Sequence, residues 1–334
     1  MNAGCQLIVP MPITKKQPIL VRDLIKREDL QLTPWTGESG LSKEISNDKV
    51  NRPGLALAGF TERFTNNRLQ ILGETEWTYL LSLPPETRRR TVERILAFDV
   101  PCIVITKGMA PSAEMKEAGE RFDTAILGST LTTDEFSHFL IEYLEPYFAP
   151  STAVHGALVD VYGIGLLFTG RSGIGKSETA LDLVERGHRL VADDVVTAYR
   201  MRRGVVMGTG NELMQHYMEI RGVGLIDIPS MFGIRSTRVR KRIEVVVELE
   251  EWQDKANYER TGLEEKTTTL LDVELPFVRI PIVSGKNLTV IAEVVALNHS
   301  LKLVGMNPAV ELNQRLVDIM KQKKAVKYDQ EDYE

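Results

Sequence analysis

The octapeptide GRSGIGKS, residues 170 to 177, constrains the fold more than any other feature of this sequence. Its glycines allow positive φ angles and a close approach of the backbone to a ligand. Consecutive amide groups in such a loop can point inward around an anion, and a helix that begins beside it adds its positive end. The pattern Gly-x-x-x-x-Gly-Lys-Ser is that of a phosphate-binding loop between a buried strand and a helix. The sequence therefore predicts a strand–loop–helix unit that holds phosphates.

Each position of this loop has an expected task. The Lys176 ammonium would bridge phosphate oxygens, and the Ser177 hydroxyl would bind magnesium. The remaining residues would surround the phosphates, and they are Gly170, Arg171, Ser172, Gly173, Ile174 and Gly175. A plain glycine turn with an exposed lysine is the alternative. The continuous apolar run Leu166–Phe168 argues against it, because such runs are typical of strands buried on both faces.

The second half of the chain predicts an α/β domain over residues 149–325. Two strands joined by a turn at Tyr162-Gly163 are expected before the loop, and Gly187 is expected to end the helix after it. Further elements are expected as strands near 215–221, 242–251 and 287–297 and as a last helix from Pro308 to about Lys323. The polar residues 326–334 are expected to form a disordered tail.

Residues 1–148 predict a separate α/β domain, whose role the sequence leaves unclear. Apolar segments at 55–59 and 100–106 are expected to be strands, and PPETRRRTVERILAF between them is expected to be a helix. A second helix is expected after Thr132, whose side chain can cap it ahead of acidic residues. Alternating strands and helices are typical of α/β domains. The small residues of APSTAVHG, 149 to 156, predict a linker between the two domains.

Composition argues against several classes of protein. The chain has 41 basic and 46 acidic residues, a net charge of −5, which argues against bulk nucleic-acid binding. Its two cysteines, Cys5 and Cys102, form no C-x-x-C pair, so neither a zinc site nor a redox motif is indicated. The N-terminus lacks the pattern of a signal peptide, and no apolar window approaches the roughly 18 residues of a membrane span. We therefore expect a reduced cytoplasmic protein that does not span a membrane.

Two pairs of polar residues follow the predicted phosphate site. Asp193 and Asp194 end a predicted strand. Because adjacent strand residues point to opposite faces, one can face the phosphates while the other holds the loop or a metal. Glu219 and Arg221 share one face of an extended segment, as suits a metal–phosphate site. From the residues alone, the first pair could instead cap a turn, and the second pair could be a solvated ion pair.

The segments that carry the most specific pattern are VHG, GRSGIGKSETAL, RLVADDVV, MEIRGVGLIDI, YERTGL and IPIVSGKNLTVIAEVVALN, in this order over roughly residues 150 to 300. In these segments the chain resembles the HPr kinase/phosphorylases of bacteria. The resemblance implies a C-terminal P-loop kinase domain with a mixed, phosphoenolpyruvate-carboxykinase-like sheet. It implies serine phosphorylation of the phosphocarrier protein HPr by ATP or pyrophosphate, and reversal by phosphate to give pyrophosphate. It also implies Mg²⁺, a homohexamer and a role in carbohydrate metabolism.

The resemblance also assigns roles to individual residues. The implied catalytic residues are His155, Lys176, Asp194 and Arg260, and the implied magnesium-linked residues are Ser177 and Glu219. Asp194 would accept the proton of the target serine and return it in the reverse direction. Arg260 would stabilise developing phosphoryl charge.

One segment departs from the family pattern. Pro281–Lys286 matches the segment linked to dephosphorylation, but Ser284-Gly285-Lys286 replaces Pro-Gly-Arg. Lysine lacks the bidentate fork of arginine, so the strength of the phosphorylase activity is left open.

Two other functions share parts of this pattern. A metabolite kinase or a phosphoenolpyruvate-carboxykinase-like enzyme would use the same loop on a small substrate. A nucleotide-sensing regulator would bind ATP and a partner without transferring phosphate. A GTPase is not indicated, because the chain lacks a guanine-reading Asn-Lys-x-Asp.

Overall fold

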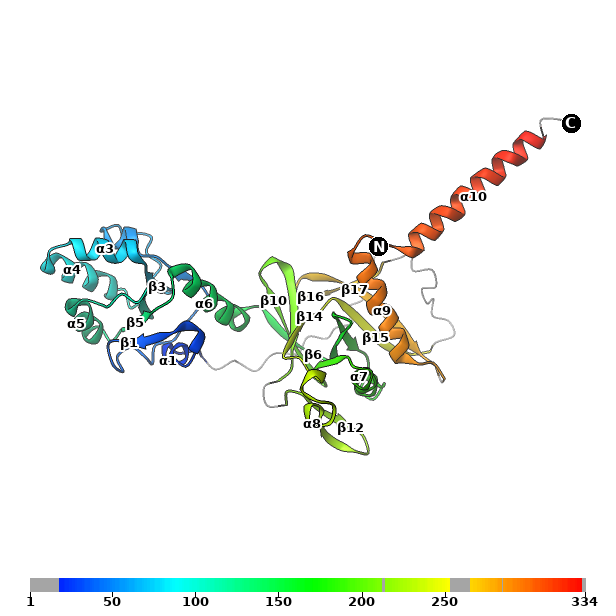
Figure 1. The fold of residues 1–334 in the computed structure, drawn as a ribbon, viewed down its shortest axis with the longest axis horizontal. Coiled ribbons are helices and arrows are strands. Elements are labelled where there is room, and N and C mark those ends of the chain that lie inside the picture. Colours follow the sequence, from blue (N-terminus) through cyan, green and yellow to red (C-terminus); the bar gives the residue numbers. More distant parts are fainter. Residues whose placement is uncertain (1–17, 212–213, 253–264, 284, 332–334) are drawn as a thin grey trace. The chain divides into compact units, whose positions relative to one another are not determined.

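The structure is a computed structural model that describes residues 18–211, 214–252, 265–283 and 285–331, with side chains described as far as residue 321. Contacts between Cα atoms divide the chain after Ala149 into an N-terminal unit and a C-terminal unit. Figure 1 shows the elements of both units along the chain. Each unit is described by itself.

The N-terminal unit is built on a five-stranded sheet in the order β1-β5-β4-β3-β2. Strands β2 to β5 are parallel, and β1 pairs antiparallel with β5. The strands are β1 (Leu32–Pro34), β2 (Val50–Asn51), β3 (Leu69–Leu72), β4 (Cys102–Ile105) and β5 (Ala125–Ser129). The three central strands are buried throughout, as expected of a parallel sheet covered on both faces.

Helices cover both faces of this sheet. One apolar cluster joins alternate sheet residues to α1 and α6, and a second joins the intervening residues to the other four helices. The helices are α1 (Val21–Ile25), α2 (Gly54–Leu57), α3 (Glu74–Ser82), α4 (Pro85–Leu96), α5 (Ala113–Arg121) and α6 (Thr133–Phe148), with a 3₁₀ turn at Glu28–Leu30. Thr132 accepts a hydrogen bond from the Glu135 amide and caps α6 as expected.

One predicted strand of this unit is wrong. Residues 55–59 lie largely in the short helix α2, and the strand that occupies this part of the sheet is β3, which the sequence reasoning missed. Only Ala56 and Leu57 of the segment are buried, whereas Leu55 is 73% exposed. A one-turn amphipathic helix and a short buried strand have the same apolar composition, so periodicity cannot separate them.

The C-terminal unit is built on a six-stranded mixed sheet in the order β16-β17-β15-β8-β7-β9. Strands β8, β15 and β17 are parallel, and the outer pairings are antiparallel. The strands are β7 (Ala157–Val161), β8 (Ile164–Thr169), β9 (Arg189–Ala192), β15 (Val245–Glu251), β16 (Thr267–Leu270) and β17 (Val273–Ile282). The expected turn joins β7 to β8, where Tyr162 and Gly163 both have positive φ.

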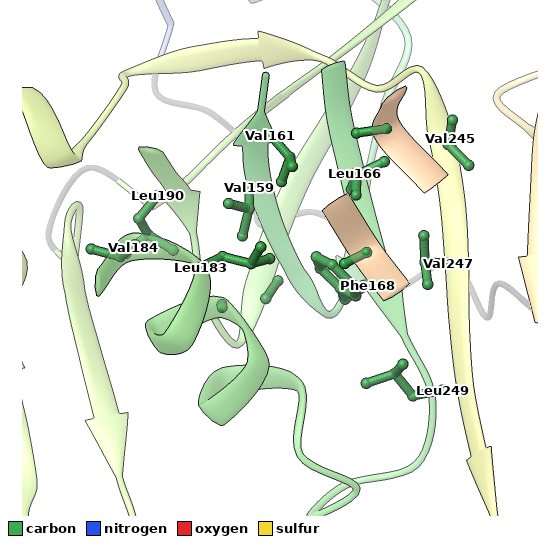
Figure 2. Close-up of a cluster of buried hydrophobic side chains, with 14 of the residues drawn as sticks. Val159, Val161, Leu166, Phe168, Leu183, Val184, Leu190, Val245, Val247 and Leu249 are labelled. Carbon is green, nitrogen blue, oxygen red and sulfur yellow. The ribbon is translucent and has the colours of Figure 1, made fainter. Parts of the chain in front are cut away.

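Two layers cover this mixed sheet. On one face lie α7 (Lys176–Glu185) and α9 (Leu288–Leu303), packed on the cluster around Val159, Phe168 and Val247 that Figure 2 shows. On the other face lies a four-stranded sheet of β6 (Ser151–His155), β10 (Val195–Met201), β11 (Val205–Thr209) and β14 (Arg240–Arg242). A hairpin, β12 (Tyr217–Ile220) and β13 (Gly224–Asp227), leads into α8 (Ile228–Phe232), and short 3₁₀ turns lie at Arg202–Gly204 and Ile234–Ser236.

Two predictions for the end of the chain need correction. The segment 287–297 is not a strand but most of helix α9, because Asn287 caps a helix by accepting a hydrogen bond from the Val290 amide. The last helix, α10 (Pro308–Glu331), does not end near Lys323, so the tail expected to be disordered from residue 326 is helical to Glu331. No proline or glycine interrupts that segment.

Glu293 fastens α9 to the C-terminal end of α7. Its carboxylate accepts two hydrogen bonds from Arg186, at 2.9 and 2.7 Å, and lies 3.1 Å from Nε2 of His188. The Tyr162 hydroxyl donates to the same carboxylate at 3.4 Å. Glu293 is only 7% exposed, so its charge is stabilised by these partners rather than by water.

Glu293→Ala is expected to lower the free energy of unfolding by about 2 kcal/mol at pH 7. This loss is smaller than that from breaking a fully buried ion pair, because Arg186 is half exposed. The hydrogen bond from Arg186 lowers the pKa of Glu293. The ionised Glu293 therefore contributes its full stabilisation above its ordinary pKa of 4.5. That stabilisation is lost as the pH falls through the lower pKa of the folded protein. Denaturant unfolding at several pH values tests this, with the exposed Glu274→Ala as control. Equal stability of the two variants at pH 7 would contradict it.

No single helix in the described part of the chain is long and apolar enough to cross a membrane. Helix α9 and the first part of α10 meet the criteria of length and composition only when taken together across a 70° bend.

Candidate active site

The phosphate loop follows β8 directly and leads into α7. Gly170, Gly173 and Gly175 all have positive φ, at 135°, 77° and 103°. A Cβ at Gly170 would lie 2.4 Å from the carbonyl oxygen of Leu249 on β15, so this position admits only glycine. Arg171, the next residue of the loop, forms an ion pair with Glu251 at the end of β15. The loop is thus seated on the C-terminal ends of two parallel strands, where α/β sheets bind their ligands.

Lys176 lies inside the curve of this loop. Its ammonium donates hydrogen bonds to the carbonyl oxygens of Gly170 and Arg171, at 3.1 and 3.0 Å, and the residue is 6% exposed. Burial lowers the pKa of Lys176, the nearby carboxylates led by Asp193 oppose that effect, and the charge of Arg221 adds to it. A desolvated ammonium is suited to receive a phosphate.

Ser177 is held by the first aspartate of the acidic pair. Its hydroxyl donates a hydrogen bond of 3.0 Å to Oδ1 of Asp193. Burial raises the pKa of Asp193, and the hydrogen bond from Ser177 only partly offsets this. Because burial disfavours the ionised form of Asp193, a cation bound nearby would stabilise that form.

Asp194 contacts His155. Oδ1 of Asp194 lies 3.2 Å from Nδ1 of His155, and the Asp194 side chain is 74% exposed. Its backbone has φ of 65°, a left-handed conformation that aspartate tolerates better than most residues. The backbone carbonyl of Asp194 accepts the amide of Gly156 at 3.0 Å, and β10 pairs with β6 through Val195 and His155. The fold therefore presents one aspartate inward and its neighbour outward.

The β12–β13 hairpin packs beside α7 through Met218, which belongs to the core. Glu219 and Arg221 are both exposed. Within the described ranges, neither an ion pair nor a hydrogen bond joins Glu219 to Ser177. Arg221 does approach the loop: a Cβ added to Gly173 would lie 2.8 Å from one of its terminal nitrogens.

Two parts of the predicted site fall outside the residues that the structure describes. Arg260 belongs to the gap 253–264, and Ser284 is likewise not described. Lys286, the lysine that replaces the family's arginine, lies with its ammonium 5.6 Å from the centre of the Trp252 ring.

The sequence reasoning missed two features of the site. It left open which aspartate holds the loop, and the structure gives this contact to Asp193. It also expected Arg221 to share a metal–phosphate site with Glu219 without naming a contact, and the structure brings Arg221 to Gly173 of the loop. The periodicity of the strands cannot supply either contact, because Asp194 leaves the extended conformation and Arg221 stands at the start of a turn.

The arrangement suits phosphoryl transfer. A glycine loop and Lys176 can hold phosphates, Ser177 with Asp193 can bind a cation, and Asp194 is an exposed carboxylate that can exchange a proton. Phosphoryl transfer depends mainly on positioning and charge neutralisation, which these groups provide. Within the described residues, no three acidic, histidine or cysteine side chains converge as a preformed metal centre.

Comparisons with known proteins match both units. The family model described as "HPr Serine kinase C-terminal domain" matches residues 146–316, and "HPr Serine kinase N terminus" matches residues 19–144. An HPr kinase/phosphorylase of Chloroherpeton thalassium is 45% identical over 308 residues, which cover 91% of each chain. One from Geobacillus kaustophilus is 43% identical over 300 residues, 90% of this chain and 96% of the relative. One from Leptospira biflexa is 41% identical over 310 residues, 92% and 95% of the two chains.

Proposed function

The chain belongs to the HPr kinase/phosphorylase family, and we propose that it carries out both reactions of that name at the loop described above. It phosphorylates a serine of HPr with ATP or pyrophosphate. It also removes that phosphate with inorganic phosphate, which yields pyrophosphate, and so it acts in the regulation of carbohydrate metabolism. The observation that carries this proposal is the contact of His155 with an outward-facing Asp194 beside a phosphate loop, since a protein serine needs an accessible base.

In the forward direction, Lys176 and the loop amides hold the donor phosphates. The hydroxyl of the target serine loses its proton to Asp194 as its oxygen bonds to the terminal phosphorus. The bond from that phosphorus to the bridging oxygen breaks, and ADP or phosphate leaves. His155, 3.2 Å from Asp194, orients the carboxylate. Arg260 is assigned to the charge that develops on the phosphoryl group, by the match of its motif.

In the reverse direction, the same groups exchange roles. An oxygen of inorganic phosphate attacks the phosphorus of phosphoserine, and the bond from phosphorus to the serine oxygen breaks. Asp194 then returns its proton to that oxygen, as microscopic reversibility requires. The products are dephosphorylated HPr and pyrophosphate.

The residues at the loop fit a magnesium ion. Oxygen donors suit this cation, and Ser177 and Asp193 supply a hydroxyl and a carboxylate at the loop. Glu219 joins them by the match of its motif. The raised pKa of Asp193 supports the fit, because a cation would favour its ionised form. When bound, the ion would neutralise charge on the phosphates. We assign direct binding to Ser177 and Glu219, and we assign to Asp193 the task of orienting the Ser177 hydroxyl.

Asp193→Ala is expected to raise the magnesium concentration for half-maximal kinase activity by about 10- to 100-fold, the usual effect of losing a group that orients a metal ligand. Asp193→Asn keeps a hydrogen-bond acceptor for Ser177, so its magnesium requirement should lie between those of Asp193→Ala and wild type. Titration of activity with magnesium at saturating ATP measures this. An unchanged magnesium requirement in both variants would remove Asp193 from the site.

The remaining assignments rest on the family. We assign catalysis to a domain over residues 149–325 and leave the domain over residues 1–148 without a stated role. We propose a cytoplasmic homohexamer whose protein partner is HPr, without nucleic acid or membrane. Exposed apolar side chains on the last two described helices support an assembly, and they include Val294, Leu297, Leu312, Leu316 and Ile319.

Intact mass spectrometry of HPr tests the proposed function. After incubation with this protein and Mg-ATP, HPr should gain one phosphoryl group, on serine. Addition of excess phosphate should then remove it. Transfer to metabolites without HPr would indicate a small-molecule kinase, and ATP binding without any transfer would indicate a nucleotide sensor.

A further inference from the structure

Trp252 is an exposed aromatic residue beside the phosphate loop. It follows Glu251, the last residue of β15, whose carboxylate forms an ion pair with Arg171 of the loop. Trp252 is 45% exposed, although tryptophan side chains are mostly buried on average. One residue therefore separates this large aromatic ring from a direct contact with the loop, and a ligand that extends beyond the loop can reach it.

The order of the strands sets the direction in which a bound donor extends. On one side of β8, β7 is followed by β9, which ends directly before Asp193, whereas β15 and then β17 lie on the other side. The contact of Ser177 with Asp193 places the groups assigned to magnesium on the β9 side. The terminal phosphate of a donor belongs beside these groups and Asp194. The rest of the donor then extends toward the ends of β15 and β17, at the edge of the sheet where such folds bind their ligands.

A cation from the next strand already contacts the Trp252 ring. Nζ of Lys286 lies 5.6 Å from the centre of the ring, within the range of a cation–π interaction. Lys286 belongs to a turn after β17, in which its amide donates to the carbonyl oxygen of Val283 at 3.1 Å. The ring is thus reached from outside β15. The electron-rich face that attracts a cation also stacks on a planar base.

We propose that Trp252 is a specificity-determining residue that stacks on the purine base of ATP and so favours ATP over pyrophosphate as phosphoryl donor. This inference rests on the proposed function, in which both compounds are donors at the same loop. Lys176 and the loop amides hold the phosphates that the two donors share, and only ATP carries a base. Because stacking on an aromatic ring tolerates every base, Trp252 would accept other purine nucleotides as well.

Packing of the two strand ends is the competing explanation. Trp252 could serve only to join the end of β15 to the turn after β17 through Lys286. Loss of the ring would then lower the stability of the unit and weaken the binding of nucleotides and pyrophosphate alike. A stacking contact affects only the ligands that carry a base.

The test measures binding by calorimetry for wild type, Trp252→Ala and Trp252→Phe, with Trp35→Ala as control. Trp35 is 36% exposed and has the ammonium of Lys116 4.6 Å from its ring centre, but it belongs to the N-terminal unit. In Trp252→Ala, the Kd for Mg-ADP should rise about 5- to 150-fold, the usual effect of losing one stacked base, and the Kd for Mg-pyrophosphate should stay within about threefold. Trp252→Phe keeps a smaller ring and should lie between Trp252→Ala and wild type.

Kinase assays with the two donors complete the test. Trp252→Ala should raise the KM for ATP and leave both the KM for pyrophosphate and kcat with pyrophosphate unchanged. The proposal is overturned if ADP binding is unchanged, or if the binding of ADP and of pyrophosphate weakens by the same factor. If wild type phosphorylates HPr with neither donor, the proposed function fails. The calorimetric comparison of ADP with pyrophosphate then still decides whether Trp252 contacts the base.

Discussion

Asp194→Asn is expected to abolish phosphoryl transfer to HPr and its reversal by phosphate to a similar degree. Asparagine has the same shape and tolerates the left-handed backbone at this position, where φ is 65°. It cannot accept the serine proton, and it cannot return a proton in the reverse direction. Loss of general base catalysis costs about 100- to 10,000-fold. Because Asp194 does not hold the phosphate loop, the Kd for ATP should change little.

Asp272→Asn is the matched control for this variant. Asp272 also has a left-handed backbone, with φ of 59°, and its exposed carboxylate pairs with Arg200 at 3.0 Å. It should retain full activity in both directions. Kinase and phosphorylase rates measured side by side decide the role of Asp194. A variant that loses only one direction, or neither, would show that a different group moves the proton.

Lys176→Met is expected to lower kinase activity with ATP and with pyrophosphate alike, on the order of 100- to 1,000-fold, because both donors depend on the same ammonium. Methionine matches the buried stem of this lysine but cannot donate to phosphate, nor to the carbonyl oxygens of Gly170 and Arg171. Unlike Asp194→Asn, this variant should also weaken the binding of ATP, since the charge that receives the phosphates is gone.

Initial rates and nucleotide titrations of Lys176→Met measure both effects, and the exposed Lys49→Met controls for the loss of a positive charge. Comparison of Lys176→Met with Asp194→Asn thus separates nucleotide binding from proton transfer. Activity within tenfold of wild type would mean that Lys176 only donates hydrogen bonds to its own loop and does not contact the substrate.

The strand–loop–helix unit could be predicted because local chemistry specifies it. The apolar run ending at Phe168 forms β8, the glycines adopt positive φ, and Gly187 follows the end of α7. The hairpin at Tyr162-Gly163 was predictable for the same reason, since two residues of positive φ make the turn.

Elements whose identity depends on tertiary packing were not predictable from the pattern. Residues 287–297 are apolar almost throughout, so nothing in their periodicity separates a buried strand from helix α9, and the cap at Asn287 decides the outcome. The strand β17 was missed, although it lies beside β15 in the central sheet. Its proline-bearing sequence reads as a loop until its parallel partner is known.

The site was predictable to the extent that motifs specify it. The positions of Lys176, Ser177 and the aspartates follow from spacing, but the division of work between Asp193 and Asp194 follows from a left-handed residue that no pattern indicated. The approach of Arg221 to Gly173 joins a hairpin to a loop far away in sequence. Arg260 lies outside the described residues, and its role stays a prediction.

The fate of labelled inorganic phosphate tests the central claim most directly. Serine-phosphorylated HPr is incubated with this protein, magnesium and ³²P-phosphate, and the products are separated. The account predicts that the label enters pyrophosphate in the same amount as HPr loses its phosphoryl group, and that Asp194→Asn forms neither product. Release of unlabelled inorganic phosphate without labelled pyrophosphate would show hydrolysis by water, and would contradict a single reversible transfer site.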